Sequence, residues 1–353
     1  MWWAQIFGLI KTVLMDSATG RGFYLRNYII KRLLISVVIL FIVSFIIYAL
    51  MRSIPASYVE SIARERANLP GAKSYTEWLQ QLNQIYGLDS GIIKGFFGWI
   101  KNVVQGDFGD SWIYNVPVTE KFRETVWFSF ALGSISFALQ VMIAIPLGIL
   151  AARKQYSKTD YAVTVVALVG ISLPLFFFAT IIKLIFSINL GWFELFGTVG
   201  RFYEQLSPWG QFLDIAKHFV MPIATIVIVS IGGLMRYTRT NMLEVLNSDY
   251  IRTARAKGLT ERRVINYHGF RNTLIPIVTI IGGSIPGLFA GALITETLFG
   301  ITGIGRTAYL AMRGGDIPFS MFYLLFLAAL TLLGTLTADI LYAVVDPRVR
   351  VNK

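Results

Sequence analysis

The sequence predicts an all-α protein that crosses a membrane several times, and three observations support this. The first is composition, since 55% of the 353 residues are hydrophobic and 15% are charged, whereas a typical soluble domain is about 25% charged. The second is a set of charge-free apolar runs, each long enough to cross a bilayer. The third is an uneven distribution of lysine and arginine among the loops between these runs.

The charge-free runs contain between 17 and 28 residues, and about 17–25 apolar residues cross the hydrocarbon core. Prolines lie inside several runs, where they free a backbone carbonyl and permit a bend; they are Pro146, Pro174, Pro222 and Pro286. An even number of spans puts both termini on one side. We therefore expect six transmembrane helices, at Leu33–Met51, Thr125–Ala152, Tyr161–Ile182, Phe219–Met235, Asn272–Thr295 and Ile317–Ala338.

The loops on the side of the termini carry 19 lysines and arginines against six acidic residues, whereas the opposite face has 12 against 13. The positive-inside rule therefore places both termini in the cytoplasm. The net charge of +12 is explained by this topology, so no nucleic-acid partner is expected. The chain has no cysteine and two histidines, so we expect neither thiolate catalysis nor a metal site.

The chain divides into an N-terminal extension, residues 1–27, and a transmembrane domain, residues 28–353. Residues 1–15 are apolar but too short to span, which leaves an interfacial helix and an unstructured tip both open. Residues 52–124 form an external segment in which YTEWLQQLNQIYG and IIKGFFGWIKNVVQ have helical spacing. These two helices either form a docking platform for an external partner or lie on the bilayer.

Residues 300–307, GITGIGRT, are similar to the phosphate-binding loop pattern G-x-x-x-x-G-K-[ST], with Arg306 in place of the lysine. Such a loop must join a strand to a helix. This segment follows the fifth predicted span on the outer face, where no ATP is present. The sequence therefore predicts a glycine-rich external turn and no nucleotide site.

The cytoplasmic loop between the fourth and fifth spans, residues 236–271, is the most informative stretch. Ser248 can cap a helix that begins at Asp249, and the Asp249 carboxylate favours the positive end of the helix dipole. Gly258 follows where a left-handed residue ends a helix, and Thr260 can cap a second short helix. We expect a compact, basic pair of helices on the cytoplasmic face.

The segment DYIRTARAKGLTERRV, residues 249–264, resembles the cytoplasmic EAA loop of ABC-importer permeases, specifically the oligopeptide/dipeptide/nickel class. Arg252 stands where the general motif has glutamate, and Thr302-Gly303 stands where the external turn has Pro-Gly. Several further motifs match in order; they are YGLD at 86–89, GDFGDS at 106–111, PV at 117–118, ETLFGITGIG at 296–305 and DPRVR at 346–350.

The resemblance implies a type I ABC-importer permease in the plasma membrane of a prokaryote, lining a path for oligopeptides or dipeptides. It implies a homologous second permease, two cytoplasmic ATPase subunits and an extracytoplasmic binding protein as partners. The chain itself would perform no catalysis and hold no cofactor, because ATP would bind to the ATPases. Nickel or oligosaccharides remain alternative cargoes. A secondary transporter is disfavoured, because the charge-free runs offer no coupling carboxylate.

The resemblance also implies which residues contact the ATPase, while the cargo-binding residues stay unknown. We expect Ala254 to lie where the two backbones come closest, so that Ala254→Glu would separate the subunits. Tyr250, Thr253 and Lys257 would share its face, because they recur at three and four residues. The full predicted interface is Asp249, Tyr250, Arg252, Thr253, Ala254, Ala256, Lys257, Gly258 and Leu259.

Overall fold

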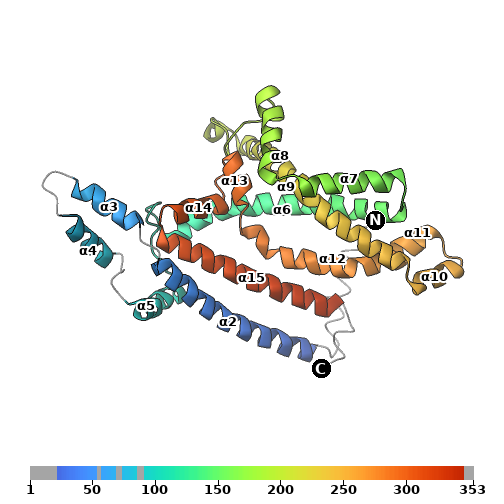
Figure 1. Cartoon of the computed structure of the whole chain (residues 1–353), viewed down its shortest axis with the longest axis horizontal. Helices are drawn as coiled ribbons and strands as arrows, with labels where there is room; N and C mark the ends of the chain where they lie inside the picture. The colour runs from blue at the N-terminus through green and yellow to red at the C-terminus, as the bar shows by residue number, and fades with distance from the viewer. Residues whose placement is uncertain (1–21, 54–56, 69–73, 86–90, 346–353) are drawn as a thin grey trace.

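The computed structural model describes residues 22–53, 57–68, 74–85 and 91–345, and helices dominate these ranges (Figure 1). Among the described residues the β pairing is limited to one isolated bridge, between Asp110 and Pro117. The predicted all-α fold is therefore confirmed. The N-terminal apolar stretch, the YGLD motif and the DPRVR tail lie outside the described residues.

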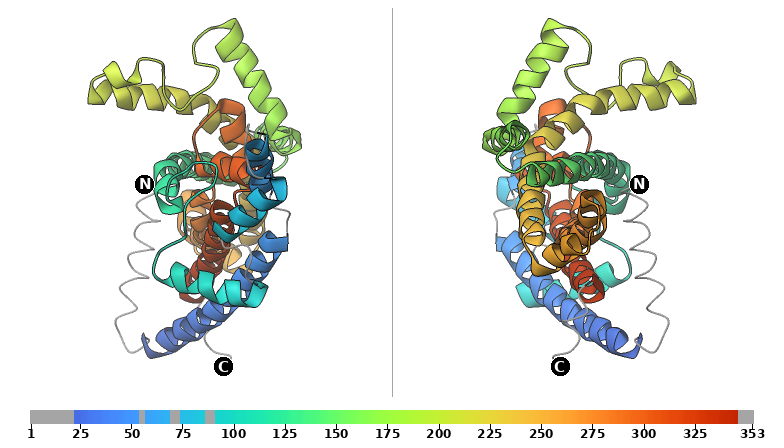
Figure 2. Two further views of the ribbon diagram at one scale, coloured as in Figure 1. Left: turned by 90° about the vertical axis from the view of Figure 1, so that its left-hand side faces the viewer. Right: turned by 90° about the vertical axis from the view of Figure 1, so that its right-hand side faces the viewer.

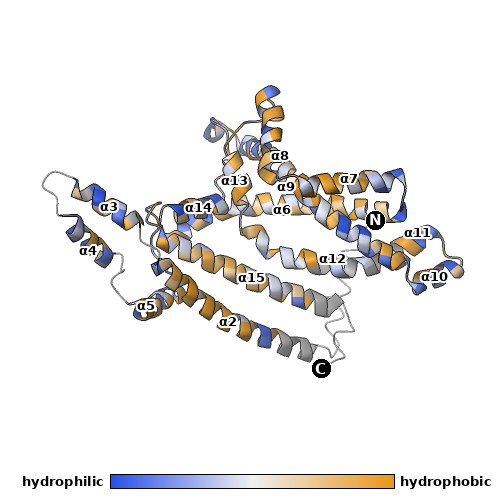
Figure 3. Ribbon diagram, viewed as in Figure 1, coloured by the Kyte–Doolittle hydropathy of each residue, from blue (hydrophilic) through white to orange (hydrophobic). Residues whose placement is uncertain are grey.

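Four helices of the described part are long and apolar enough to cross a membrane. They are α2 (Gly22–Ser53), α6 (Val118–Arg153), α9 (Pro208–Leu246) and α15 (Ile317–Val345). α2, α6 and α15 run along the long axis of the molecule in Figure 1, and their apolar character is visible in Figure 3. These helices match the first, second, fourth and sixth predicted spans.

The third predicted span is bent. α7 (Lys158–Ser172) is followed by α8 (Leu175–Ile182) and the π-helix η2 (Lys183–Asn189), and the two parts meet at 102°. The bend lies at Pro174, because proline pushes the preceding residue out of the helical region. Leu173 accordingly has ψ 123° and Pro174 has ψ 132°. The bend that this proline permits is therefore present in the third span.

The fifth predicted span is also broken. α12 (Phe270–Ser284) passes into the 3₁₀ helix η5 (Pro286–Phe289), and α13 (Leu293–Phe299) follows at an angle of 47°. Pro286 is the first residue of η5. By contrast Pro146 and Pro222 lie inside α6 and α9, which continue through them. Counting each bent pair as one span gives up to six spans in the described part of the chain.

The main core lies between α6, α7 and α9, where buried apolar side chains such as Ile149, Met235 and Ile231 pack together. Glycines let these helices approach closely. A Cβ added at Gly148 would lie 2.6 Å from the carbonyl oxygen of Met235, and one at Gly232 would lie 2.3 Å from that of Ala167. Small residues of this kind drive helix association where lipid removes the hydrophobic advantage.

Two charged side chains at the ends of the spans have specific partners. Arg239 on α9 donates to both carboxylate oxygens of Asp160 at the start of α7, at 2.6 and 2.7 Å. The Lys183 ammonium donates to the carbonyl oxygen of Leu298 at 2.6 Å and lies 3.6 Å from the centre of the Phe196 ring. Both groups therefore join neighbouring helices.

Two groups of short helices lie at opposite ends of the molecule (Figure 1). One end carries α3 (Ser57–Ala67), α4 (Tyr75–Ile85) and α5 (Ile92–Val104), which confirms the two helices predicted in the 52–124 segment. The other end carries α10 (Asp249–Ala256) and α11 (Glu261–Arg263). α14 (Ile304–Arg313) packs beside α15 at the first end. Which end faces the cytoplasm stays a prediction.

Candidate functional site

The helix pair α10–α11 projects from the end of α9 and leads, through the π-helix η4 (Val264–Gly269), into α12. α10 begins at Asp249, as predicted. The predicted side-chain caps are wrong, since neither Ser248 nor Thr260 makes a capping hydrogen bond. The Ser248 hydroxyl instead donates to the carbonyl oxygen of Val245 at 2.6 Å, which ties the turn back to α9.

One side of α10 is buried within the loop itself. Ile251 and Ala254 pack against Val264, with Val245 and Leu259 around them. Ala254 is only 5% exposed. The expectation that its side chain faces a partner at the closest approach is therefore wrong, because residues three apart on a helix share a face and Ile251 already commits that face to the core of the loop.

The glycine at the end of α10 has the predicted left-handed conformation. Gly258 has φ +73° and stands directly after the C-cap residue Lys257. The amide of Gly258 donates to the carbonyl of Arg255 at 2.9 Å, and the amide of Leu259 to that of Ala254 at 3.4 Å. This pair of bonds is the Schellman motif, which ends helices at glycine and packs the following apolar residue back on the helix.

The opposite side of α10 is open to solvent and carries most of the predicted interface. The Thr253 hydroxyl donates to the carbonyl oxygen of Asp249 at 2.9 Å, so the helix keeps its own polar groups satisfied on this side. Tyr250 is 45% exposed. The six predicted residues that lie here are Asp249, Tyr250, Arg252, Thr253, Ala256 and Lys257, and we call them the α10 face.

An ion pair that the sequence did not predict joins α10 to α11. Arg255 donates to the two carboxylate oxygens of Glu261 at 2.8 and 3.2 Å. This hydrogen bond from Arg255 holds the pKa of the Glu261 carboxyl below its ordinary value, and the same bond raises the pKa of Arg255. The two residues are six apart, a spacing that brings them together only because Gly258 reverses the chain between them.

The glycine-rich turn at residues 300–305 encloses a carboxylate of the chain itself. Glu296 on α13 is fully buried. It accepts from the amides of Ala292 and Arg306, each at 2.8 Å, and from the hydroxyl of Ser129 on α6 at 2.7 Å. Backbone amides that would surround a phosphate in a nucleotide site are therefore directed at an internal carboxylate. We call this arrangement the Glu296 cradle.

The GDFGDS motif is anchored on the same end of the molecule through a second buried carboxylate. Asp316 accepts from the hydroxyl of Ser111, from the amide of Ile113 at 3.2 Å and from the amide of Phe319 at 3.1 Å. The neighbouring Tyr114 hydroxyl donates to the carbonyl oxygen of Thr307 at 2.9 Å. Burial, and next the charge of Asp316, raise the pKa of Tyr114 to about 12.

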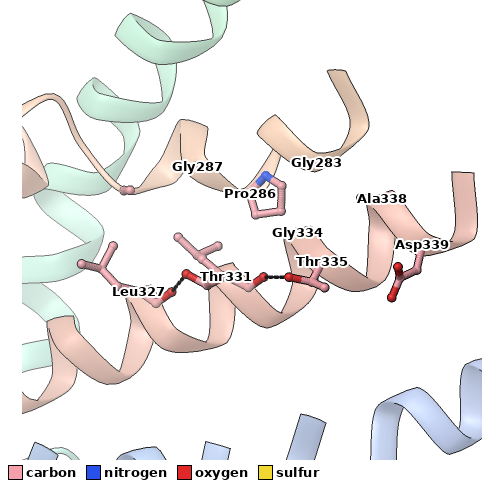
Figure 4. Close-up of a pocket in the computed structure, with 11 residues that line it drawn as sticks. Gly283, Pro286, Gly287, Leu327, Thr331, Gly334, Thr335, Ala338 and Asp339 are labelled. Atoms are coloured by element: carbon pink, nitrogen blue, oxygen red, sulfur yellow. Dashed lines mark hydrogen bonds between the residues drawn. The ribbon is translucent and has the colours of Figure 1, made fainter. Parts of the chain in front are cut away.

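A groove of about 440 Å³ separates α12 and η5 from α15 (Figure 4). The hydroxyls of Thr331 and Thr335 line it but donate to carbonyls of their own helix, at 2.8 and 3.0 Å. Asp339 lies at one end of the groove, 3.2 Å from Arg32. Sequence reasoning missed this groove, since its walls come from segments about 50 residues apart.

No group of three metal-ligating side chains occurs in the described ranges.

Comparison with known proteins identifies the family of this chain. The family model "Binding-protein-dependent transport system inner membrane component" matches residues 144–351, and the model of its N-terminal part matches residues 25–117. The chain belongs to this family. It is accordingly a multi-pass inner-membrane protein, and the match over residues 144–351 includes the whole α10–α11 pair and Glu296 itself.

Individual relatives cover nearly the whole chain. The oligopeptide transport system permease protein AppB of Bacillus subtilis is 36% identical over 323 residues, which is 91% of this chain and 98% of the relative. The dipeptide transport system permease protein DppB of Escherichia coli is 33% identical over 343 residues, covering 93% and 99%. The oligopeptide transport system permease protein OppB of Haemophilus influenzae is 33% identical over 325 residues, covering 92% and 99%.

Proposed function

We propose that this chain is a permease subunit of an ABC importer that carries oligopeptides or dipeptides across the inner membrane. The observation that carries the proposal is full-length similarity to family members that are named as peptide permeases. In this proposal the chain pairs with a homologous second permease and receives cargo from an external binding protein. ATP binds to two separate ATPase subunits, and the chain itself holds no cofactor.

The contact with the ATPase is assigned to the α10 face. Asp249, Arg252, Thr253 and Ala256 recur at three and four residues and therefore form one ridge, and all four are exposed. The ridge offers two small side chains between charged ones, which lets another protein approach the helix backbone. Ala254 and Leu259 support the ridge from inside the loop, and Gly258 sets the angle of the following helix.

The α10–α11 pair is suited to transmit a movement of the ATPase to the membrane helices. α10 follows α9 directly, and α9 has 39 residues, so it extends about 58 Å at 1.5 Å per residue. The Schellman motif, the Arg255–Glu261 pair and the apolar cluster around Ile251 hold the loop as one body. Movement of the α10 face would then shift α9 and α12 together, which is the motion that alternating access requires.

The test of the peptide function is transport by the purified complex in liposomes. We expect the chain to co-purify with two ATPases and a different permease, and to take up a labelled di- or oligopeptide only with ATP and the binding protein. A transport-competent complex that contains this chain as a homodimer would contradict the pairing. Uptake of nickel or of an oligosaccharide, with peptides rejected, would contradict the proposed cargo.

The contact itself is tested on the exposed side, because Ala254→Glu would also break the loop's own core. Ala256→Arg places a long side chain on the α10 face and should abolish ATPase association, with membrane insertion unchanged. Thr240→Arg, at an exposed position on α9, is the matched control and should leave association intact. Normal transport by Ala256→Arg at equal abundance would overturn the assignment.

The orientation of the two ends can be tested in this cysteine-free chain. Cysteines introduced at Lys257 and at Asn102 lie at exposed positions of opposite ends. In intact cells an impermeant thiol reagent should label the residue at 102 and not the residue at 257. The reverse pattern would overturn the positive-inside assignment.

A further inference from the structure

α5 lies across the direction of the long helices. It is seen nearly end-on in Figure 1 and lengthwise in Figure 2, which views the molecule along its long axis. It stands at the end of the bundle opposite α10, beside α2. A helix that lies perpendicular to membrane spans runs parallel to the membrane surface, so the distribution of its apolar residues shows what surrounds it.

One part of the apolar arc of α5 is packed on α2. Phe96 is only 1% exposed, and its ring makes edge contacts with the rings of Phe41, Phe45 and Tyr48, at centroid distances of 5.5, 5.2 and 5.8 Å. Trp99 lies 5.7 Å from Tyr48 on the same side. These contacts fix the rotation of α5 about its own axis.

The other part of the arc is open to the outside in the described part of the chain. Ile93, Phe97 and Val104 are 67%, 57% and 82% exposed, and their spacing of four and seven residues places them on one side of the helix. Lys94 directly follows Ile93, and Lys101 comes seven residues after Lys94, so the two lysines lie on one side of the helix next to the stripe. Both are exposed. The open apolar stripe is therefore bordered by two lysines on the side away from α2.

The depth of the contact on α2 places this stripe at the level of the bilayer. Phe41 is the midpoint of the candidate span Ile29–Ser53, and at 1.5 Å per residue it lies about 18 Å from the end at Ser53. The hydrocarbon core is about 30 Å thick, so the ring of Phe96 reaches the outer half of the core. The stripe also continues the exposed apolar surface of α2, where Phe41 and Ile42 are 47% and 52% exposed.

We propose that α5 is an in-plane helix seated in the membrane leaflet at this end of the bundle. Ile93, Phe97 and Val104 enter the boundary between headgroups and acyl chains, while Lys94 and Lys101 extend toward the phosphates. Interfacial helices combine an apolar face with lysines along the border of the polar face, and lysine stems bury along apolar surface while the ammonium stays in water. The occupant of the stripe is therefore lipid.

The position of α5 in the leaflet also affects the position of α3 and α4. Val59 and Ala63 of α3, Leu82 of α4 and Phe96 of α5 belong to one buried cluster. A helix held at the membrane surface would thus fix the height of the α3–α4 pair, which projects farther from the bundle (Figure 1). This inference rests on the chain's place in the membrane and is independent of the proposed cargo.

Spin labels on single cysteines test the proposal in the complete complex reconstituted into liposomes. The variants Ile93→Cys, Phe97→Cys and Val104→Cys should collide several-fold more with oxygen than with a water-soluble nickel chelate. Ile42→Cys on α2 is the lipid control. Gln105→Cys, on the polar side of α5, and Thr76→Cys, at an exposed position of α4, are the water controls and should show the reverse preference.

Two outcomes would overturn the proposal. Chelate accessibility at Phe97 equal to that at Thr76 would show that the stripe faces water. Protection of all three stripe positions from both reagents would show that another protein covers it. Because the substitutions lie at exposed positions, peptide uptake by each variant should stay within twofold of the parent, which confirms that the labelled complex is folded.

Discussion

The α10–α11 pair and the α13–α14 pair are built alike but differ in what their polar groups face. In both, a helix ends at a glycine with positive φ, Gly258 at +73° and Gly300 at +69°, and a second short helix follows. In the α13–α14 pair the carboxylate, Glu296, is completely buried and surrounded by donors of the chain. In the α10–α11 pair the carboxylate, Glu261, is 55% exposed.

This difference separates an internal joint from a contact surface. The donors around Glu296 come from α6, from the start of α13 and from α14, so the Glu296 cradle fixes three helices to one another and leaves nothing for a partner. The α10–α11 pair satisfies its own backbone and packs one side, and the α10 face stays free. A helix that ends at a glycine can therefore lead into either arrangement, and the two are distinguished here by the burial of the neighbouring carboxylate.

The largest effect should follow loss of the buried carboxylate. Glu296→Ala removes the acceptor from two backbone amides and one hydroxyl, and each buried donor left unsatisfied costs about 1–3 kcal/mol. We expect a marked fall in the thermal unfolding midpoint of the solubilised complex. Glu296→Gln, which keeps an acceptor oxygen, should lose less. Wild-type stability in Glu296→Ala would show that water replaces the carboxylate and that the cradle is not a joint.

A smaller loss is expected from filling the space beside that carboxylate. A Cβ at Gly303 would lie 2.3 Å from Cδ of Glu296, and overpacking of this kind costs about 1–3 kcal/mol. Gly303→Ala should therefore lower the unfolding midpoint. The φ of Gly303 is −93°, which any residue adopts, so crowding is the sole reason for the loss. The double variant Gly303→Ala with Glu296→Ala should lose less than the sum of the two single variants.

At Gly258 a substitution is limited by the backbone conformation and not by crowding. A Cβ there would meet nothing within 4 Å, but the left-handed conformation costs an ordinary residue about 1–2 kcal/mol. Gly258→Ala should lower the coupling of ATP hydrolysis to transport, with abundance in the membrane unchanged. Gly258→Asn is the control, because asparagine visits this conformation more readily. Equal transport by Gly258→Ala and the parent would indicate that the angle of α11 is unimportant.

The smallest effect should come from the exposed ion pair. Because the pKa of Glu261 is lowered, the pair contributes above the ordinary pKa of a glutamate and is lost as pH falls through the lower, folded value. Exposed pairs contribute about 0.2–1 kcal/mol, so Glu261→Gln should change the unfolding midpoint slightly at neutral pH. The change should shrink on acidification and at high salt. A stabilising effect of Glu261→Gln at neutral pH would contradict the assignment.

The sequence by itself determined the features that depend on local chemistry. Charge-free length predicted the positions of the spans, because an unpaired charge in hydrocarbon is costly wherever the helix packs. The glycine after Lys257 predicted a left-handed turn, because only glycine adopts it without strain. The start of α10 at Asp249 was predicted from residue type, although the predicted Ser248 cap does not form. The helices over the 75–85 and 92–104 ranges followed from the spacing of their apolar residues.

Only the tertiary structure decided which groups meet across long separations. Four prolines permitted bends, but they behave differently. The chain bends sharply at Pro174 and changes from an α-helix to a 3₁₀ helix at Pro286, whereas α6 and α9 continue through Pro146 and Pro222. Ala254 has the composition of a contact residue, but Val264, ten residues away, covers it. Ser129 reaches Glu296 across 167 residues. A periodic pattern defines a face of a helix. Which residues pack against that face depends on the packing of the whole chain, and the local sequence does not specify it.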